Sequence, residues 1–197
     1  AVVENDHRDE IYEGIGPYGK PIGELTPDEV LELMKRAGIV GMGGAGFPAH
    51  VKLAGAVGKA DTLIINGAEC EPYLTADHRL MLESGQEIIN GMRLLMQCLG
   101  LKACTIAIED NKRDAIEKME ELAAGCTDVS IRVAAMKTKY PQGGEKQLIN
   151  ALTGREVPPG KFPVDVKCAV FNVDTCASVA RSYRSGMPVH KRIVTVS

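Results

Sequence analysis

The stretch DTLIINGAECEPYLTADHR, residues 61–79, contains the pattern that decides the fold. Its first part, DTLIING (61–67), centres on the apolar residues Leu63, Ile64 and Ile65 and is typical of a buried strand. A polar loop with one proline follows, and Asp77 and His78 then mark the expected start of a helix, with Asp77 as its cap. A strand that leads through a loop into a helix is the repeating unit of α/β proteins.

The same alternation of strand and helix continues along the rest of the chain. Residue patterns predict helices at 84–100, 111–125, 144–154 and 174–186, and strands at 103–110, 128–136, 168–173 and 191–196. Before the first strand, Thr26, Pro27 and Gly38 delimit another helix, and Pro48 can start a short one. We therefore expect an α/β fold with a mostly parallel sheet and helices on both faces.

The length of the chain and the sequences at its two ends indicate the domain organisation. A chain of 197 residues suits one domain. Residues 1–25 are rich in glycine, proline and charge without a clear period, so we expect an irregular lead-in to a core domain at 26–197. The last predicted strand runs to the end of the chain, and we expect the chain to be the core of a longer protein.

Composition narrows the classes of function. The net charge is −3 and the sequence pI is near 5.9, so we expect no nucleic-acid partner. No apolar run approaches the roughly 18 residues that span a bilayer, and we expect no direct membrane insertion. The six cysteines include no Cys-x-x-Cys pair, and the four histidines have no metal-ligand spacing. We expect free thiols in a reducing cytoplasm, and no metal site.

A glycine-rich loop follows the first predicted helix. Its glycines are Gly41, Gly43, Gly44 and Gly46. The spacing matches the dinucleotide fingerprint, but that fingerprint follows a strand, and this loop follows a helix. Glycines still allow several backbone N–H groups to face one anion, and Lys52 in the next helix can add a charge. We therefore expect a phosphate site that is not a Rossmann loop. The alternative is a tight turn between two helices, which needs fewer glycines.

A second loop, at 66–79, follows the first predicted strand, and ligands of α/β proteins bind at the carboxyl ends of strands. Asn66 offers an amide, and Glu69 and Glu71 flank Cys70. The two carboxylates can bond ribose hydroxyls or a ligand amide, or they can be solvated surface groups.

Two further loops have similar features. Gly143 and Gly144 precede a helix whose first turn contains Glu145, which can also simply complement the helix dipole. Asn172 ends a predicted strand, and Asp174 or Thr175 can cap the helix that follows. We expect the four loops to form one cleft. No arrangement of nucleophile and base is visible, so we name no catalytic residue and expect a site for binding a cofactor.

Together these loops resemble a known family. The motifs are GMGGAGFPAHVKL (41–53), LIINGAECEPYLTADHRLM (63–81), YPQGGEKQLINALTGREVP (140–158) and FNVDTCASV (171–179). They resemble the C subunit of the Rnf ion-translocating electron-transport complex and, more distantly, the flavin-bearing, NADH-oxidising subunit of respiratory complex I. The resemblance implies a core of the complex I flavoprotein type, with noncovalent FMN that accepts hydride from NADH.

The resemblance also implies roles for individual residues. FMN contacts are expected at Gly41, Gly43, Gly44, Lys52, Asn66, Glu69, Cys70, Tyr140, Gly143, Gly144, Asn172 and Thr175. NADH contacts are expected at Gly46, Phe47, Glu71, Glu145 and Phe162. Glu71 would hold the nicotinamide amide, and Phe47 and Phe162 would flank the adenine. The complex I relatives differ from this chain at Ala68, Gly144 and near Gly55.

The resemblance finally implies a cellular setting. The partners would be the other Rnf proteins, on the cytoplasmic side of the cell membrane, and the chain would be peripheral. Two [4Fe–4S] clusters would lie in a C-terminal domain that this chain lacks, and an N-terminal domain is missing too. A cobalamin-reductase type of flavoprotein and a proline-reductase partner have related cores and remain alternatives. A non-catalytic docking module is the alternative that is not an enzyme.

Overall fold

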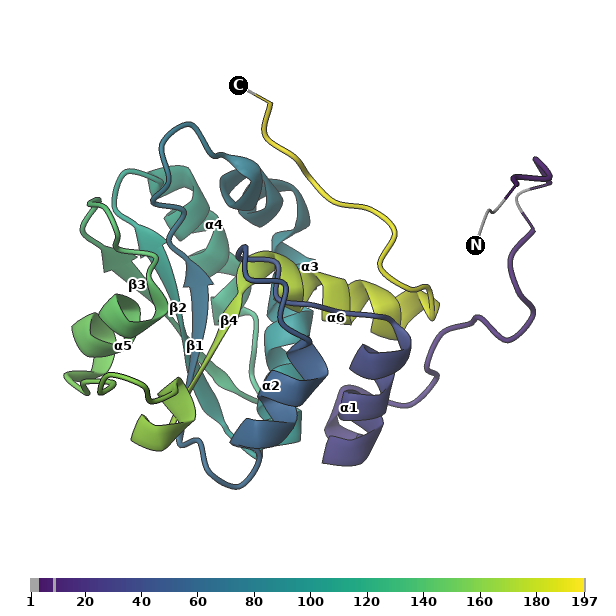
Figure 1. Cartoon of the computed structure of the whole chain (residues 1–197), viewed down its shortest axis with the longest axis horizontal. Helices are drawn as coiled ribbons and strands as arrows, with labels where there is room; N and C mark the ends of the chain where they lie inside the picture. Colours follow the sequence, from purple (N-terminus) through teal and green to yellow (C-terminus); the bar gives the residue numbers. More distant parts are fainter. Residues whose placement is uncertain (1–3, 9, 197) are drawn as a thin grey trace.

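The computed structural model describes residues 4–8 and 10–196. Its centre is a sheet of four parallel strands in the order β3-β2-β1-β4 (Figure 1). The strands are β1 (Thr62–Gly67), β2 (Ala103–Glu109), β3 (Ser130–Met136) and β4 (Cys168–Asn172). Ile65 on β1 lies opposite Ile106 on β2 and Phe171 on β4, and all three are buried. The parallel α/β fold expected from the sequence is confirmed.

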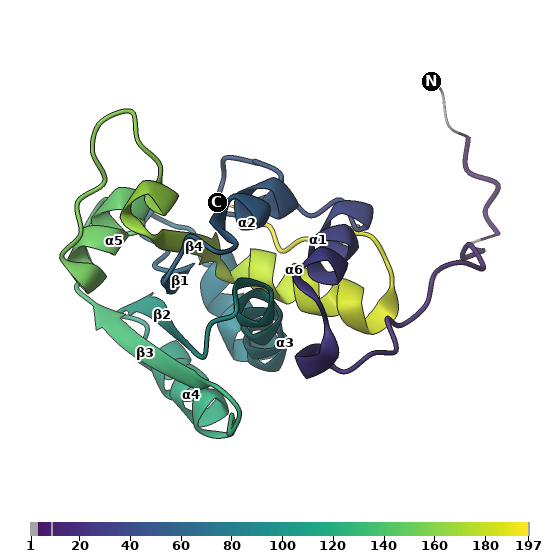
Figure 2. The ribbon, with the colours of Figure 1, turned by 90° about the horizontal axis from the view of Figure 1, so that it is seen from below.

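Helices cover both faces of the sheet, as Figure 2 shows from below. They are α1 (Pro27–Arg36), α2 (Ala49–Ala56), α3 (Ala76–Leu99), α4 (Arg113–Ala124), α5 (Glu145–Thr153) and α6 (Val173–Ser185), with short 3-10 turns at Ile22–Glu24 and Pro163–Val166. On one face, α5 packs Leu148 and Ile149 against Ile64 and Val170. The other helices contribute to the larger core on the opposite face.

Local signals set the start of α1. The Thr26 hydroxyl accepts a hydrogen bond from the Glu29 N–H at 3.3 Å, and the Glu29 carboxylate accepts one from the Thr26 N–H at 2.7 Å. This reciprocal pair satisfies two N–H groups that the helix itself leaves free. The bond from Thr26, with the ammonium of Lys20, lowers the pKa of Glu29 to about 2. The helix predicted after Thr26 is confirmed.

The longest helix, α3, crosses α6 at close range. A Cβ atom added at Gly91 would lie 1.9 Å from the carbonyl oxygen of Cys176, so only glycine fits at this crossing. The helix begins at Ala76 and has non-helical backbone angles at Ser84, where the sequence predicted a helix start. Thr75, and not Asp77, occupies the cap position, so the predicted cap is wrong by two residues.

The segment predicted as a last strand, 191–196, is not a strand. It runs back from the end of α6 as an extended segment across the top of the molecule (Figure 1). Its contacts are single ones: Thr195 Oγ1 accepts from the Thr75 N–H at 3.2 Å, and Arg192 donates to the Met42 carbonyl at 2.6 Å. A strand needs a ladder of partners, and in the described part of the chain no strand lies beside this segment.

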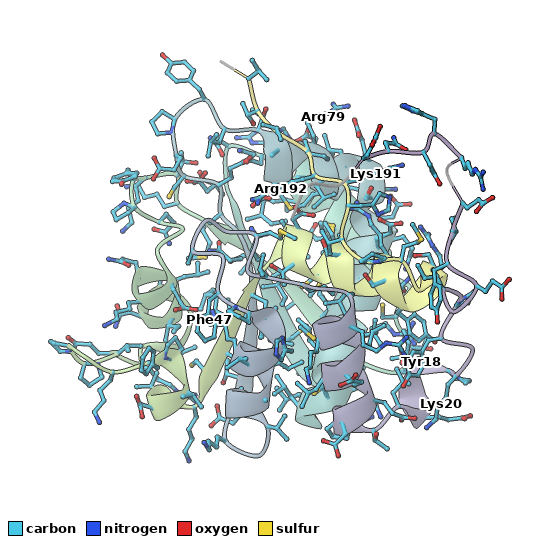
Figure 3. All side chains as sticks on the ribbon, turned by 45° about the vertical axis from the view of Figure 1, so that its right-hand side comes forward. Tyr18, Lys20, Phe47, Arg79, Lys191 and Arg192 are labelled. Atoms are coloured by element: carbon cyan, nitrogen blue, oxygen red, sulfur yellow. The ribbon has the colours of Figure 1, made fainter. Side chains whose placement is uncertain are left out.

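The part of the lead-in that contains Tyr18 and Lys20 packs against the end of α6 (Figure 3). The Tyr18 N–H donates to the Tyr183 carbonyl at 3.1 Å, and the Tyr183 hydroxyl donates to the Lys20 carbonyl at 2.5 Å. The rings of Tyr18 and Tyr183 stack with centroids 6.2 Å apart. These contacts join the segment before α1 to the core.

Candidate functional site

The loops that follow the strands meet at the carboxyl edge of the sheet and enclose two adjoining clefts. The larger has a volume of about 730 Å³ and the smaller about 330 Å³. Both clefts are lined by Gly43, Asn66, Gly143, Gly144 and Asn172. The sequence predicted one cleft here, and these five residues form a wall, which we call the shared wall, between two.

Most of the predicted site residues line these clefts. Apart from the shared wall, the larger cleft is lined by Gly44, Glu69, Cys70, Glu71 and Tyr140, and the smaller by Gly41, Phe47, Lys52, Glu145 and Thr175. Gly46 lies in the glycine loop but lines neither cleft. Phe162 is 72% exposed beside the second 3-10 turn and is not brought to either cleft.

The glycine loop is held at its base and open at its tip. The Gly41 N–H donates a hydrogen bond to the Phe47 carbonyl at 2.8 Å, which joins the two ends of the loop. The Met42 N–H donates to Thr175 Oγ1 at 3.0 Å and ties the loop to α6. Gly44 has a φ of +116°, a region that favours glycine. Among the described residues, the N–H groups at 43–46 make no well-formed hydrogen bond. Such a loop presents free donors to an anion.

Two asparagines fix the shared wall. Asn66 donates to the Gly143 carbonyl at 2.8 Å and accepts from the Ala68 N–H at 3.0 Å. Asn172 accepts from the Asp174 N–H at 2.9 Å, so it caps α6, where Asp174 or Thr175 had been predicted. The wall is therefore tied to β1, β4 and the loop before α5.

Gly143 is needed for this close packing. A Cβ atom at Gly143 would lie 2.2 Å from the Ala68 carbonyl oxygen. The Gly143 N–H also donates to Cys70 Sγ at 3.2 Å. The sequence placed Cys70 and Gly143 on separate loops of the site, and the structure shows that these two loops interlock.

Glu69 supports the beginning of α3. Its carboxylate accepts from the N–H groups of Asp77 and His78 at 3.0 and 3.3 Å. Lys112, from the loop before α4, lies 3.4 Å away from it, and both side chains are almost completely buried. The expected flavin contact of Glu69 therefore competes with three partners already bound to its carboxylate. Glu71, two residues on, is exposed at the edge of the larger cleft.

Asp77 lines the larger cleft, whereas its sequence position predicts only a capping role. Its Oδ2 accepts from Asn172 Nδ2 at 2.6 Å, and the residue lines the larger cleft. Burial raises the pKa of the Asp77 carboxyl to about 7, and the nearby charges of Glu69 and Asp174 contribute to the rise. Burial also raises the pKa of Asp174.

Arg192 completes one side of the larger cleft. Its guanidinium donates to the Met42 carbonyl, at the start of the glycine loop. In the view of Figure 3, Arg192 lies above this loop and Phe47 below it. The sequence pattern indicates no role for Arg192, because it predicts residues 191–196 as a strand of the sheet. Lys112 was missed as well, since its partner is 43 residues away.

The smaller cleft contains an ion pair. Lys52 on α2 pairs with Glu145 at the start of α5, and Lys52 Nζ lies 5.4 Å from the centroid of the Phe171 ring. The two charged residues predicted for different ligands thus contact each other. Each side chain remains about one-third exposed, at 35% and 37%, so a ligand can reach both.

Other features of the described residues bear on the kind of site. All six cysteines are free thiols. In the described ranges, no three or more His, Cys, Asp or Glu side chains are grouped so that they could hold a metal ion. Within the same ranges, no helix has the length and apolar character to cross a membrane.

Three curated relatives match along most or all of this chain. The C subunit of the proton-translocating ferredoxin:NAD(+) oxidoreductase complex of Clostridium ljungdahlii is 48% identical over 100% of this chain and 42% of its own length. The C subunit of the Na(+)-translocating complex of Acetobacterium woodii is 46% identical over 99% of this chain and 44% of its own length. The C subunit of the ion-translocating oxidoreductase complex of Vibrio cholerae is 45% identical over 88% of this chain and 22% of its own length. The chain spans less than half of each relative, and the resemblance to the C subunit of such complexes is confirmed.

Solved structures give the same fold. A chain of an NAD+-reducing [NiFe]-hydrogenase in the air-oxidised state superposes with a TM-score of 0.72 at 27% identity, over 84% of this chain and 32% of that one. The H2-reduced state gives a TM-score of 0.70 at 28% identity, over 82% of this chain and 31% of that one.

The family assignment rests on the region that builds both clefts. Residues 34–181 match the family described as the Nuo51 FMN-binding domain. This range includes the glycine loop, all four strands and the first nine of the thirteen residues of α6. The chain therefore belongs to the Nuo51 FMN-binding domain family.

Proposed function

We propose that this chain is the electron-input module of an Rnf-type ion-translocating complex, which binds FMN and oxidises NADH. The observation that carries the proposal is the pair of clefts with one shared wall, in a domain of an FMN-binding family. The two clefts adjoin at this wall, so one elongated ligand can place its phosphate in the smaller cleft and its ring system in the larger one. The relatives that are named as components of ferredoxin:NAD(+) oxidoreductase complexes support NADH as the second ligand.

The residues present fit FMN. Its phosphate needs N–H donors and a cation, which the open glycine loop at 43–46 and Lys52 supply. Its ring system needs a cleft of several hundred Å³, and the larger cleft has about 730 Å³. Asn66 and Asn172 lie between these two parts and would position the ribityl chain and the ring.

NADH would contact the two clefts from the outer side. Phe47 is 53% exposed and offers a ring for stacking at the smaller cleft. Glu71 offers a carboxylate to the nicotinamide amide at the larger one. Glu145 and Phe162 complete the proposed set, although Phe162 lies outside both clefts.

The protein's part in the reaction is positioning and electrostatics. Bound FMN supplies the redox chemistry, because a flavin accepts a hydride and releases electrons singly. The chain holds both ligands in the orientation that this transfer needs, and the N–H groups and Lys52 neutralise the phosphate charge. We propose that iron–sulfur clusters in a further domain, and then other proteins of the complex on the cytoplasmic side of the membrane, receive the electrons.

An anaerobic titration tests the proposal. FMN is added to the purified chain, excess FMN is removed, and NADH is then added while absorbance is followed in the flavin band. Retained flavin that bleaches with NADH is the expected result. Retained flavin that does not bleach would contradict NADH oxidation by this domain. A chain that retains no FMN would contradict the flavin module and favour the docking-module alternative.

A further inference from the structure

Asp77 lines the larger cleft and has a partner on only one of its two carboxyl oxygens within the described residues. It lies in the first turn of α3, and its Oδ2 is held by Asn172 Nδ2 at 2.6 Å. Its Oδ1 accepts no hydrogen bond from any residue within the described ranges. Because Asn172 also caps α6, the Asp77 side chain is fixed on one oxygen and available on the other.

The charges that face Asp77 come from three neighbouring segments. Glu69 lies in the loop before α3, Asp174 on α6, and Arg192 in the C-terminal segment. The Glu69 carboxylate is bound by Lys112, and Arg181 lies 3.8 Å from Asp174. Burial is the largest influence and raises the pKa of Asp77 to about 7, so both protonation states are present near neutral pH.

We propose that Asp77 in its protonated form donates a hydrogen bond to the bound flavin, and that its ionisation weakens flavin binding. The inference rests on the proposed function, since it places FMN in the larger cleft. A neutral carboxyl is a donor, whereas a carboxylate is an acceptor only. Flavin rings carry carbonyl oxygens and ring nitrogens that accept hydrogen bonds. The ionised form would also place a negative charge beside an anionic ligand.

Proton linkage gives this inference a direct test. If FMN selects the protonated form, binding above pH 7 must take up a proton from solution. Calorimetric titration of the chain with FMN at pH 8, in two buffers of different ionisation enthalpy, measures that uptake. The FMN phosphate is already fully ionised at pH 8 and contributes little. We expect an uptake approaching one proton per FMN for the wild type, and none for Asp77→Asn.

The affinity itself provides a second measurement. For the wild type we expect FMN affinity to fall by at most about tenfold between pH 6 and pH 8. Asp77→Asn keeps an acceptor for Asn172 and a donor for the ligand, so its affinity should lack this fall. Asp128→Asn removes the same charge at a remote surface site that pairs with Arg93, and it should behave as the wild type.

The outcomes separate the two proposals. If neither the wild type nor Asp128→Asn binds FMN, the proposed function is overturned and this inference with it. If all three proteins bind FMN with no proton uptake, and with one common pH profile, only the inference is overturned. If Asp77→Asn does not fold, a wild type that takes up no proton at pH 8 still overturns the inference, and an uptake near one proton supports it.

Discussion

Lys52 and Glu145 form an ion pair across the smaller cleft, and each side chain is about one-third exposed. A pair exposed to this degree contributes about 1 kcal/mol or less to stability. A phosphate with two negative charges and several N–H partners can therefore displace Glu145 from Lys52. The pair keeps the lysine in place before the ligand binds, and it makes the two residues respond oppositely to mutation.

We expect Lys52→Gln to weaken FMN binding by about ten- to a hundredfold, because a hydrogen bond to a charged group contributes about 1.5–3 kcal/mol. Glu145→Gln should leave FMN binding unchanged or tighter, since it releases Lys52. Quenching of flavin fluorescence on titration gives both dissociation constants. Equal weakening by both substitutions would show that the pair acts as a unit in binding.

We expect Gly44→Val to abolish FMN binding. The reason is the backbone: no other atom lies within 4 Å of the Cβ position, but the φ of +116° is one that a branched residue rarely adopts. The loop would change shape and its free N–H groups would turn away. Gly55→Val on α2 is the matched control, because its Cβ position is also open and its φ is ordinary. Wild-type affinity in Gly44→Val would refute the role given to this loop.

Gly91→Ala should destabilise the fold without touching either cleft. Its new methyl group would overlap the Cys176 carbonyl oxygen, so α3 and α6 must move apart. Forcing extra atoms into a packed core typically costs about 1–3 kcal/mol. Urea unfolding should show this loss, while Gly55→Ala on α2, with open space around it, should unfold close to the wild type. An unchanged urea midpoint for Gly91→Ala would mean that α3 and α6 cross less closely than the structure shows.

Buried acids should make the fold less stable as pH rises. Burial raises the pKa values of Asp77, Asp174 and Glu109, so the folded chain holds protons that the unfolded chain has already lost. Stability then falls from about pH 4 and levels off above the folded pKa values. The pKa of Asp77 rises from its ordinary value of 3.8 to about 7 in the folded chain. This difference corresponds to a loss of about 4 kcal/mol at most in the free energy of unfolding.

Urea unfolding at pH 4.5 and 7.5 measures this fall in stability. We expect Asp77→Asn to make the fall shallower, while Asp174 and Glu109 preserve part of it. Asp128→Asn should have no effect between these pH values, because the bond from Arg93 lowers the pKa of Asp128 and places its titration below the range. A wild-type stability that rises over this interval would contradict the burial of these acids.

Local signals predicted most of the elements, because their causes lie within a few residues. The α1 start is an example, since Thr26 and Glu29 are three residues apart. The segment 191–196 shows the limit of such signals. Its β-branched residues, Ile193 to Val196, favour a strand. A strand also requires a neighbour in the sheet, and sequence spacing does not show which neighbour is present.

The candidate site was predictable in its loops and not in its side-chain pairs. Glycines and asparagines at strand ends marked the positions that now line both clefts. The bond of Glu69 to the start of α3 spans eight residues, and its pair with Lys112 spans 43, so neither follows a local spacing rule. Asp77 was named only as a cap, since its burial against Asn172 exists only after β1 and β4 are side by side.

The shared wall means that the two clefts cannot act independently. FMN that crosses the wall and NADH that contacts the clefts from the outer side would both lie against Gly43, Gly143 and Gly144, so the binding of one restricts atoms that the other also touches. The two affinities are then thermodynamically coupled, and each ligand must change the affinity for the other by the same factor. Retention of one nucleotide thus becomes a function of the concentration of the other, without any domain movement.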